Sequence, residues 1–340
     1  MPSVADMVRN RSDQIDFDAV ARKFPWLFQR NLDCIVSPDS DGLLCALLMS
    51  HHLGWKVRGF YDGKVLAVDQ QTKPSDCVFL DMEIFRSGVR SVGQHMLLYN
   101  RNQTPEQWHQ FDQSFAVNNF RGHDKLHEFQ LKYPFGTIHV LMVTLASQLK
   151  IELSDEAVAP LLFTDGTYHN LFGYTENSLN WLHYLRLDEP GNPLAELLSI
   201  KKYTITQLME HMNGFWRRRD EISIKGERGD RIAISRRGDK PEIHNMTDNG
   251  KNFRLADSAL NRAVRFIKLL ESDTGWKYRE EHWQWKDWSV HLFEKGSMNL
   301  TGKRLNGPNF KELIANNPLS LAITSGNALE YTLDPKGLFR

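Results

Sequence analysis

Two carboxylates one residue apart follow a short apolar segment near the start of the chain. Residues 34–36 are apolar, Ser-Pro-Asp-Ser-Asp-Gly follows at 37–42, and a further apolar run comes next. If the first segment is a strand, Asp39 and Asp41 leave its carboxyl end together, and their oxygens can share a divalent cation. Gly42 would let the chain turn tightly into a helix whose first amides face the same edge. The segment also suits a plain turn with a helix N-cap, so both interpretations stay open.

More acids and a histidine occupy similar positions further along the chain. Asp81 and Asp165 each close an apolar run, and His95 lies in a short predicted strand. Ligands of open α/β sheets bind at the carboxyl ends of the strands, so we expect these side chains to join the first two carboxylates there. A histidine on its own is more often an ordinary hydrogen-bonded side chain, and His95 is favoured only by its position relative to the acids. His139 and His123 are weaker candidates for the same pocket.

The elements that would position these side chains are those of an α/β fold. Apolar patterns predict strands at 32–36, 56–61 and 76–82, and helices at 41–53 and 138–149. The run at 76–82 is continuously apolar, as in a buried parallel strand. We therefore expect a parallel-sheet N-terminal domain with a helical cover at its start (residues 1–200) and a smaller α+β C-terminal domain (residues 201–340).

Composition limits what the chain can do. The 340 residues are 41% hydrophobic and 25% charged, with 42 basic and 42 acidic side chains. A balanced charge excludes attraction of nucleic acid by the whole surface, so such binding would need a local basic patch. Three cysteines without a paired framework indicate a reducing compartment. The first residues resemble no secretory signal and no apolar run approaches a bilayer span, so we expect a cytoplasmic protein that does not enter a membrane.

Basic and aromatic side chains gather in the second half. Arginines cluster at 217–219 and 236–237, and residues 230–237 alternate as hairpin strands do. Tryptophans cluster at 283, 285 and 288. The arginines could hold backbone phosphates and the indoles could stack on unpaired bases. The alternatives are a solvated charged face for the arginines and the core of a small β domain for the tryptophans.

The order of these motifs resembles the DHH phosphoesterase superfamily, whose members include RecJ-type single-strand exonucleases. The matching features are Asp39-Ser40-Asp41-Gly42, Asp81 at a strand end, Gly93-Gln94-His95, and Asp165 after an apolar segment. They span about residues 30–170. Gly93-Gln94-His95 stands where the family has Asp-His-His, so one acid and one histidine of that motif are missing. No Gly-Gly-x-His substrate motif is found in the C-terminal half.

The resemblance implies a parallel α/β catalytic domain, bound manganese, and a smaller C-terminal domain that holds the substrate across a cleft. Carried over by position, the metal ligands would be Asp39, Asp41, Asp81, His95 and Asp165, with Mn²⁺ or Mg²⁺ as the ion. His95 and Asp41 would take part in catalysis. The side chains expected to bind the substrate are Arg217, Arg218, Arg219, Arg236, Arg237 and His123.

The expected function is metal-dependent hydrolysis of phosphodiesters in single-stranded nucleic acid or short oligonucleotides. Carboxylate ligands suit hard ions, which lower the pKa of bound water and screen the charge that develops on phosphorus oxygens. Because the third motif is incomplete, a one-metal enzyme, a site rebuilt with other residues and an inactive DHH-like scaffold that binds nucleic acid or protein all stay open. An enzyme of small phosphorylated metabolites is a further alternative, and a homodimer is compatible with each.

Overall fold

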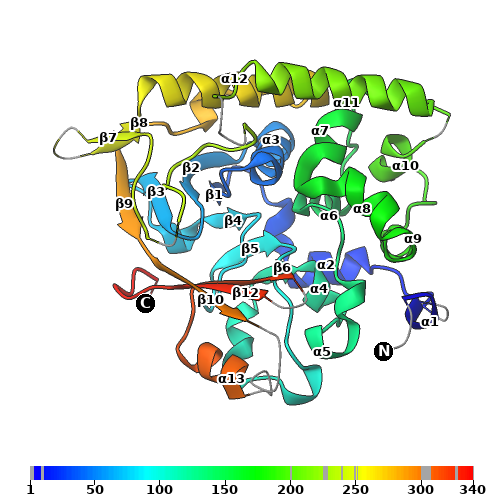
Figure 1. Cartoon of the computed structure of the whole chain (residues 1–340), viewed down its shortest axis with the longest axis horizontal. Coiled ribbons are helices and arrows are strands. Elements are labelled where there is room, and N and C mark those ends of the chain that lie inside the picture. Colours follow the sequence, from blue (N-terminus) through cyan, green and yellow to red (C-terminus); the bar gives the residue numbers. More distant parts are fainter. Residues whose placement is uncertain are drawn as a thin grey trace.

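The computed structural model describes residues 4–8, 11–199, 201–224, 229–238, 240–248, 250, 252–299, 308–325 and 328–339. These residues form an α/β fold with a large mixed sheet and a separate three-stranded sheet (Figure 1). The α/β class expected from the sequence is confirmed. Within these ranges, none of the helices combines the length and the apolar character that crossing a bilayer would need.

The large sheet has nine strands in the order β6-β5-β4-β1-β2-β3-β9-β8-β7. The first five in that order run parallel to one another, and each later neighbour is antiparallel. The parallel strands are β1 (Asp33–Val36), β2 (Lys56–Tyr61), β4 (Val78–Leu80), β5 (Arg90–Gly93) and β6 (Ser114–Ala116). The antiparallel strands are β3 (Val65–Asp69), β7 (Met246–Asp248), β8 (Phe253–Leu255) and β9 (Trp288–Leu292).

The large sheet crosses the boundary that we predicted at residue 200. Strands β7, β8 and β9 come from the second half of the chain, and β9 pairs along the whole of β3. Trp288 of β9 is buried, and Trp285 stacks on Phe60 of β2 at 5.3 Å between ring centroids. The tryptophan cluster is therefore core, as one interpretation of the sequence held, but it belongs to the large sheet and not to a small β domain.

The three-stranded antiparallel sheet is formed by β10 (Glu294–Asn299), β12 (Ala328–Leu333) and β11 (Ser320–Ser325) in that order. Only Phe293 separates β9 from β10, so the two sheets are joined by one extended segment (Figure 1). Helix α13 (Pro308–Ala315) packs its Phe310 and Ile314 into a core shared with Leu321 of β11.

Helices cover one face of the large sheet, and Phe293, Leu319 and Phe339 pack against its other face. The helix predicted at 41–53 is α3 (Ser40–Leu53), and that at 138–149 is α6 (Thr137–Ala146). Both are apolar nearly all round and almost wholly buried, which is typical of a central helix. The two longest helices that the structure describes, α11 (Ile205–Asp220) and α12 (Asp257–Thr274), lie side by side across the top in Figure 1. The others are α1 (Val4–Val8), α2 (Phe17–Lys23), α4 (Val117–Phe120), α5 (Lys125–Glu128), α7 (Val158–Phe163), α8 (Thr167–Gly173), α9 (Thr175–Tyr184) and α10 (Pro193–Leu197).

Among the described residues, the hairpin predicted at 230–237 is reduced to one antiparallel bridge between Ser235 and Ile243, with backbone hydrogen bonds from Arg236 to Glu242 and from His244 to Ile234. A second single bridge joins Arg231 of this segment to Asp39. The amide of Ile232 donates to the carbonyl of Pro38 at 2.6 Å, and Ile232 itself is buried. The first part of the segment therefore lies against the loop after β1, and only its end pairs antiparallel with the chain that follows.

Candidate functional site

The acids predicted to share a site follow strands that meet at the switch point of the sheet. Strand β1 lies between β2 and β4 and is parallel to both, so the chain leaves β1 toward one side and later returns on the other. Asp39 and Asp41 follow β1, Asp81 follows β4, and His95 follows β5. Carboxyl ends of strands at such a point form the crevice where open α/β sheets bind ligands.

Asp41 lies at the centre and is completely buried. Its two carboxylate oxygens accept hydrogen bonds from the first amides of α6, Thr137 N–H at 2.6 Å and Ile138 N–H at 2.9 Å. The positive end of the helix dipole therefore faces this carboxylate. Burial, together with the charge of Asp165, nevertheless raises the pKa of Asp41 to about 8. The acids of the site thus lie within electrostatic reach of one another.

Asp81 is held beside Asp41 by the same helix start. The hydroxyl of Thr137 donates to Asp81 Oδ1 at 2.7 Å, while the Thr137 amide donates to Asp41. Asp81 is 2% exposed, and burial followed by the charges of Asp41 and Asp39 raises its pKa. Its backbone has a φ of 61°, in the left-handed region that non-glycine residues rarely adopt. Strain of this kind clusters at functional sites.

His95 contacts two acids, and one of them, Glu83, was missed in the sequence. The Nδ1 atom of His95 lies 3.8 Å from Asp81 Oδ1 and 3.7 Å from Glu83 Oε2. Burial alone would lower the pKa of His95, but hydrogen bonding to Glu83 and its charge raise it to about 9. The signal that could have found Glu83 is the spacing of Asp81-Met82-Glu83, which repeats that of Asp39-Ser40-Asp41.

Asp39 and Asp165 lie at the rim. Asp39 caps α3 by accepting from Gly42 N–H at 3.3 Å, and its Oδ2 lies 4.0 Å from Arg231 Nη2. Asp165 is exposed, has a φ of 50°, and accepts a hydrogen bond from Gln94 Nε2 at 2.5 Å. Gln94 therefore links the β5 motif to the last of the predicted acids.

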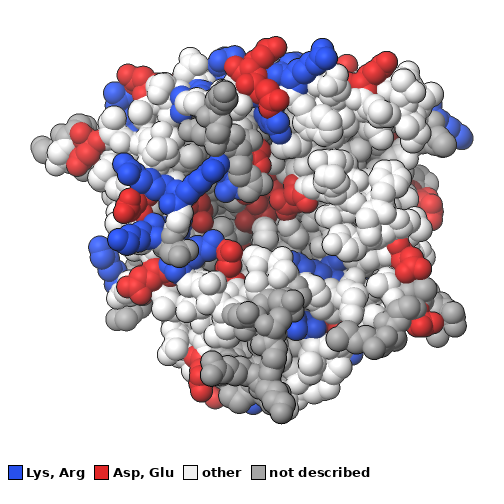
Figure 2. All heavy atoms as spheres, in the orientation of Figure 1, with Lys and Arg blue, Asp and Glu red and all other residues white. Residues whose placement is uncertain are grey.

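Two pockets lie beside the acids, and Figure 2 shows acidic side chains at the middle of one face of the molecule with basic side chains next to them. The first pocket has a volume of about 890 Å³, and its lining includes Pro38 and several basic side chains. The second, about 820 Å³, includes Asp165 and Gln94. Strand β10 borders the first pocket and β11 the second, so the small sheet lies along both. The basic residues of the first pocket are Lys64, Arg231, Arg236, Arg237 and Lys295.

Arg236 and Arg237 line the first pocket, whereas Arg217, Arg218 and Arg219 line neither pocket. Those three arginines lie on α11, which packs against α7 and α12. Arg218 makes a two-pronged ion pair with the buried Asp273, at 2.6 and 2.8 Å. Arg219 binds the neighbouring Asp220 and covers the ring of Phe163. The structure thus gives Arg218 and Arg219 contacts that stabilise the packing of α11, and it leaves Arg217 exposed.

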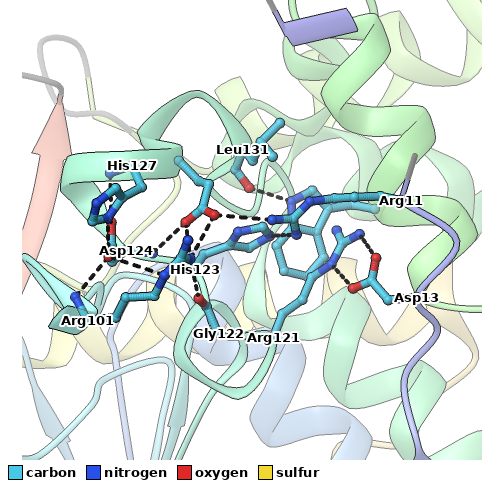
Figure 3. A network of polar contacts seen from close by, with 11 residues as sticks. Arg11, Asp13, Arg101, Arg121, Gly122, His123, Asp124, His127 and Leu131 are labelled. Atoms are coloured by element: carbon cyan, nitrogen blue, oxygen red, sulfur yellow. Dashed lines mark hydrogen bonds and ion pairs between the residues drawn. The ribbon is translucent and has the colours of Figure 1, made fainter. Parts of the chain in front are cut away.

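The two additional histidines are also buried away from solvent. His123 is 1% exposed, lies against Trp181, and belongs to the polar network in Figure 3, in which Arg11 Nη1 lies 3.4 Å from its Nε2. Burial and the nearby Arg11 and Arg121 lower the pKa of His123 to about 3. His139 lies within α6, against Phe135, and burial lowers its pKa to about 4. His123 is therefore placed to join the segment around Arg11 to the body of the protein, and not to meet a substrate.

The donor set suits a hard divalent ion, because it combines several carboxylates with one imidazole. Within the residues that the structure describes, however, no three His, Cys, Asp or Glu side chains stand close enough around one point to hold an ion. The hydrogen bonds from α6 to Asp41 and from Thr137 to Asp81 hold those carboxylates where they are. The residues fit the ion in chemistry, and holding it would require side-chain rotation.

Comparison with protein-family models, with curated proteins and with solved structures finds no match to this chain. What the site can do must therefore be argued from its own geometry.

Proposed function

We propose that this protein is a metal-dependent phosphodiesterase of the DHH type that acts on single-stranded nucleic acid or short oligonucleotides. The observation that carries the proposal is the meeting of acids from the ends of β1 and β4 with His95 after β5, at the switch point and beside a basic pocket. Phosphodiesters are anionic, so a substrate needs positive charge at both the cleavage point and its flanks.

Asp39, Asp41, Asp81, Asp165 and His95 would hold Mn²⁺ or Mg²⁺. A bound divalent ion would supply positive charge against the phosphate oxygens and make a water molecule more acidic. The side chain of His95 is 34% exposed, so its imidazole can reach a substrate oxygen and hold or give a proton there. Two amides of α6 hold the Asp41 carboxylate in place, so Asp41 would form the fixed, buried side of the site.

The two pockets support a substrate longer than one nucleotide. Lys64 Nζ donates to the carbonyl oxygens of Arg236 and of Gly238, the latter at 2.9 Å, which fixes the loop that carries Arg236 and Arg237. That loop would bind backbone phosphates on one side of the acids. On the other side, the partly exposed Phe129 and the exposed Tyr174 offer rings on which a base can stack. Buried, free thiols at all three cysteines support the cytoplasmic location that we propose.

The test is to incubate the protein with Mn²⁺ and labelled single-stranded DNA, RNA oligomers and dinucleotides. We expect cleavage of at least one substrate, and loss of cleavage in the Asp39→Ala/Asp41→Asn double variant. Asp33→Asn is a matched control, because Asp33 begins the same strand β1 at its opposite end and pairs with Arg58 at 2.8 Å. Absence of cleavage by the wild type, or cleavage that the double variant retains in full, would reject the proposal.

The second candidate is a DHH-like scaffold without activity. The observation that favours it is that both oxygens of Asp41 are already bound by α6 amides and that no ready-made ion site is present among the described side chains. Calorimetry with Mn²⁺ separates the two candidates. Specific binding that the Asp39→Ala/Asp41→Asn variant loses supports the enzyme, whereas wild-type protein that takes up no ion supports the scaffold.

A further inference from the structure

Strand β5 ends at Gly93, and the carboxyl group of Glu83 fills the space that a side chain at this position would occupy. A Cβ atom built on Gly93 would lie 2.5 Å from both Cδ and Oε2 of Glu83, far inside any real contact. The Glu83 carboxyl group thus occupies the volume that a side chain at position 93 would need. Gly93 is also the position at which the sequence lacks the acid of the Asp-His-His pattern, so an acid absent from β5 is matched by an acid that reaches the same place.

We infer that Glu83 is an additional metal-binding residue, which supplies from the loop after β4 the carboxylate that β5 does not carry. The inference rests on the proposed function. It makes the site one that binds its ion through two acid pairs of equal spacing, Asp39 with Asp41 after β1 and Asp81 with Glu83 after β4, together with His95.

The two carboxylate oxygens of Glu83 have different partners, one in the backbone and one in the proposed site. Oε1 accepts the amide of Met96 at 2.9 Å, which fixes the chain just after β5. Oε2 faces His95 Nδ1 at 3.7 Å, on the same side of that ring as Asp81 Oδ1.

Burial strengthens the inference. Glu83 is 2% exposed, and a buried carboxylate is costly unless positive charge lies near it. Lys132 is near enough to feel the charge of Glu83, but its Nζ donates to the carbonyl of Ile323 at 2.7 Å. His95 therefore carries most of the direct contact, and a cation between Glu83 and Asp81 would compensate both carboxylates.

The test moves the carboxylate from one strand end to the other. Mn²⁺ binding is measured by calorimetry for wild type, Glu83→Ala, and Glu83→Ala/Gly93→Asp. We expect Glu83→Ala to weaken binding at least tenfold and the double variant to recover most of that loss, because Asp at 93 would refill the vacated space. Glu128→Ala is the matched control, since Glu128 is also buried but pairs with Arg101 outside the site, and it should bind Mn²⁺ like the wild type.

Thermal unfolding without added metal gives an independent readout. Gly93→Ala should lower the melting temperature in the wild type, because its methyl group meets the Glu83 carboxyl, and should lower it much less in Glu83→Ala. Equal effects in both backgrounds would overturn the geometry. Wild-type affinity in Glu83→Ala would overturn the inference alone, whereas a wild type that binds no Mn²⁺ would remove the proposed function with it.

Discussion

Acid should destabilise this protein through His123, the histidine that the structure places in the network of Figure 3. Its ring is buried against Trp181, its Nε2 lies 3.4 Å from Arg11, and the guanidinium of Arg121 lies 4.4 Å from the centre of the Trp181 ring. A proton added to His123 would create a buried cation beside two arginines. The folded protein therefore resists protonation at a pH where the unfolded chain accepts it.

The magnitude follows from linkage. Burial and the two arginines lower the pKa of His123 from 6.5 to about 3, so the unfolded state binds the proton first as the pH falls. The stability that depends on the neutral ring is complete above pH 6.5 and is lost between 6.5 and about 3. Each pH unit in that window costs about 1.4 kcal/mol. At pH 5, His123 should account for a loss of about 2 kcal/mol in the free energy of unfolding.

Urea unfolding at pH 7 and pH 5 measures this loss in wild type and in His123→Gln. His139 and His52 also have lowered pKa values, so the useful quantity is the difference between the two proteins in their loss from pH 7 to pH 5. That difference should be about 2 kcal/mol, and the exposed His109→Gln control should behave as wild type. If His123→Gln loses as much stability as wild type, the network does not hold a neutral histidine and the reasoning fails. The His123→Gln variant should cleave substrate at the wild-type rate.

Three further predictions concern the arginines and the central acid. Arg218→Ala should cost about 2 kcal/mol in urea unfolding, because it leaves the Asp273 carboxylate buried without its partner, while cleavage rates stay at the wild-type level. Asp41→Asn should abolish Mn²⁺ binding in calorimetry, because an amide offers the ion one neutral oxygen where the carboxylate offers two charged ones and leaves one of the two α6 N–H groups without its acceptor. Arg236→Ala/Arg237→Ala should weaken binding of single-stranded DNA and reduce the slope of log affinity against log salt by about 1.4 in a fluorescence titration, whereas unchanged binding would remove the basic pocket from the proposed site.

The local elements could be predicted because their causes are local. Helix α3 follows from an N-cap at Asp39, an unbroken apolar run and Gly54, which adopts the left-handed C-cap conformation with a φ of 69°. Strand β2 falls at the residues expected, and β1 and β4 lie inside the predicted ranges. The order of acids after these strands then places them at one edge, because parallel strands share their carboxyl side.

What could not be predicted depends on pairing between distant segments. The antiparallel partner of β3 is β9, which lies far along the chain, and no periodicity within either strand indicates the other. The same holds for the segment around Ile232, whose alternation matched a hairpin but whose amide pairs with Pro38. The role of Arg218 was missed for a similar reason, since its partner Asp273 is identified only when α11 and α12 pack together.

In the proposed site, helix α6 and a divalent ion would compete for the carboxylates of Asp41 and Asp81. Helix α6 offers amides and the Thr137 hydroxyl to Asp41 and Asp81, and hydrogen bonds to charged groups contribute about 2 kcal/mol each. Those bonds lessen, but do not remove, the effects of burial and of repulsion between the acids, which raise the pKa values of both. For an ion to bind here, the free energy of binding must therefore exceed the cost of rotating the carboxylates toward it. If Glu83 and His95 complete its coordination, that balance favours the enzyme, and if they do not, α6 alone holds the acids and the protein remains a scaffold.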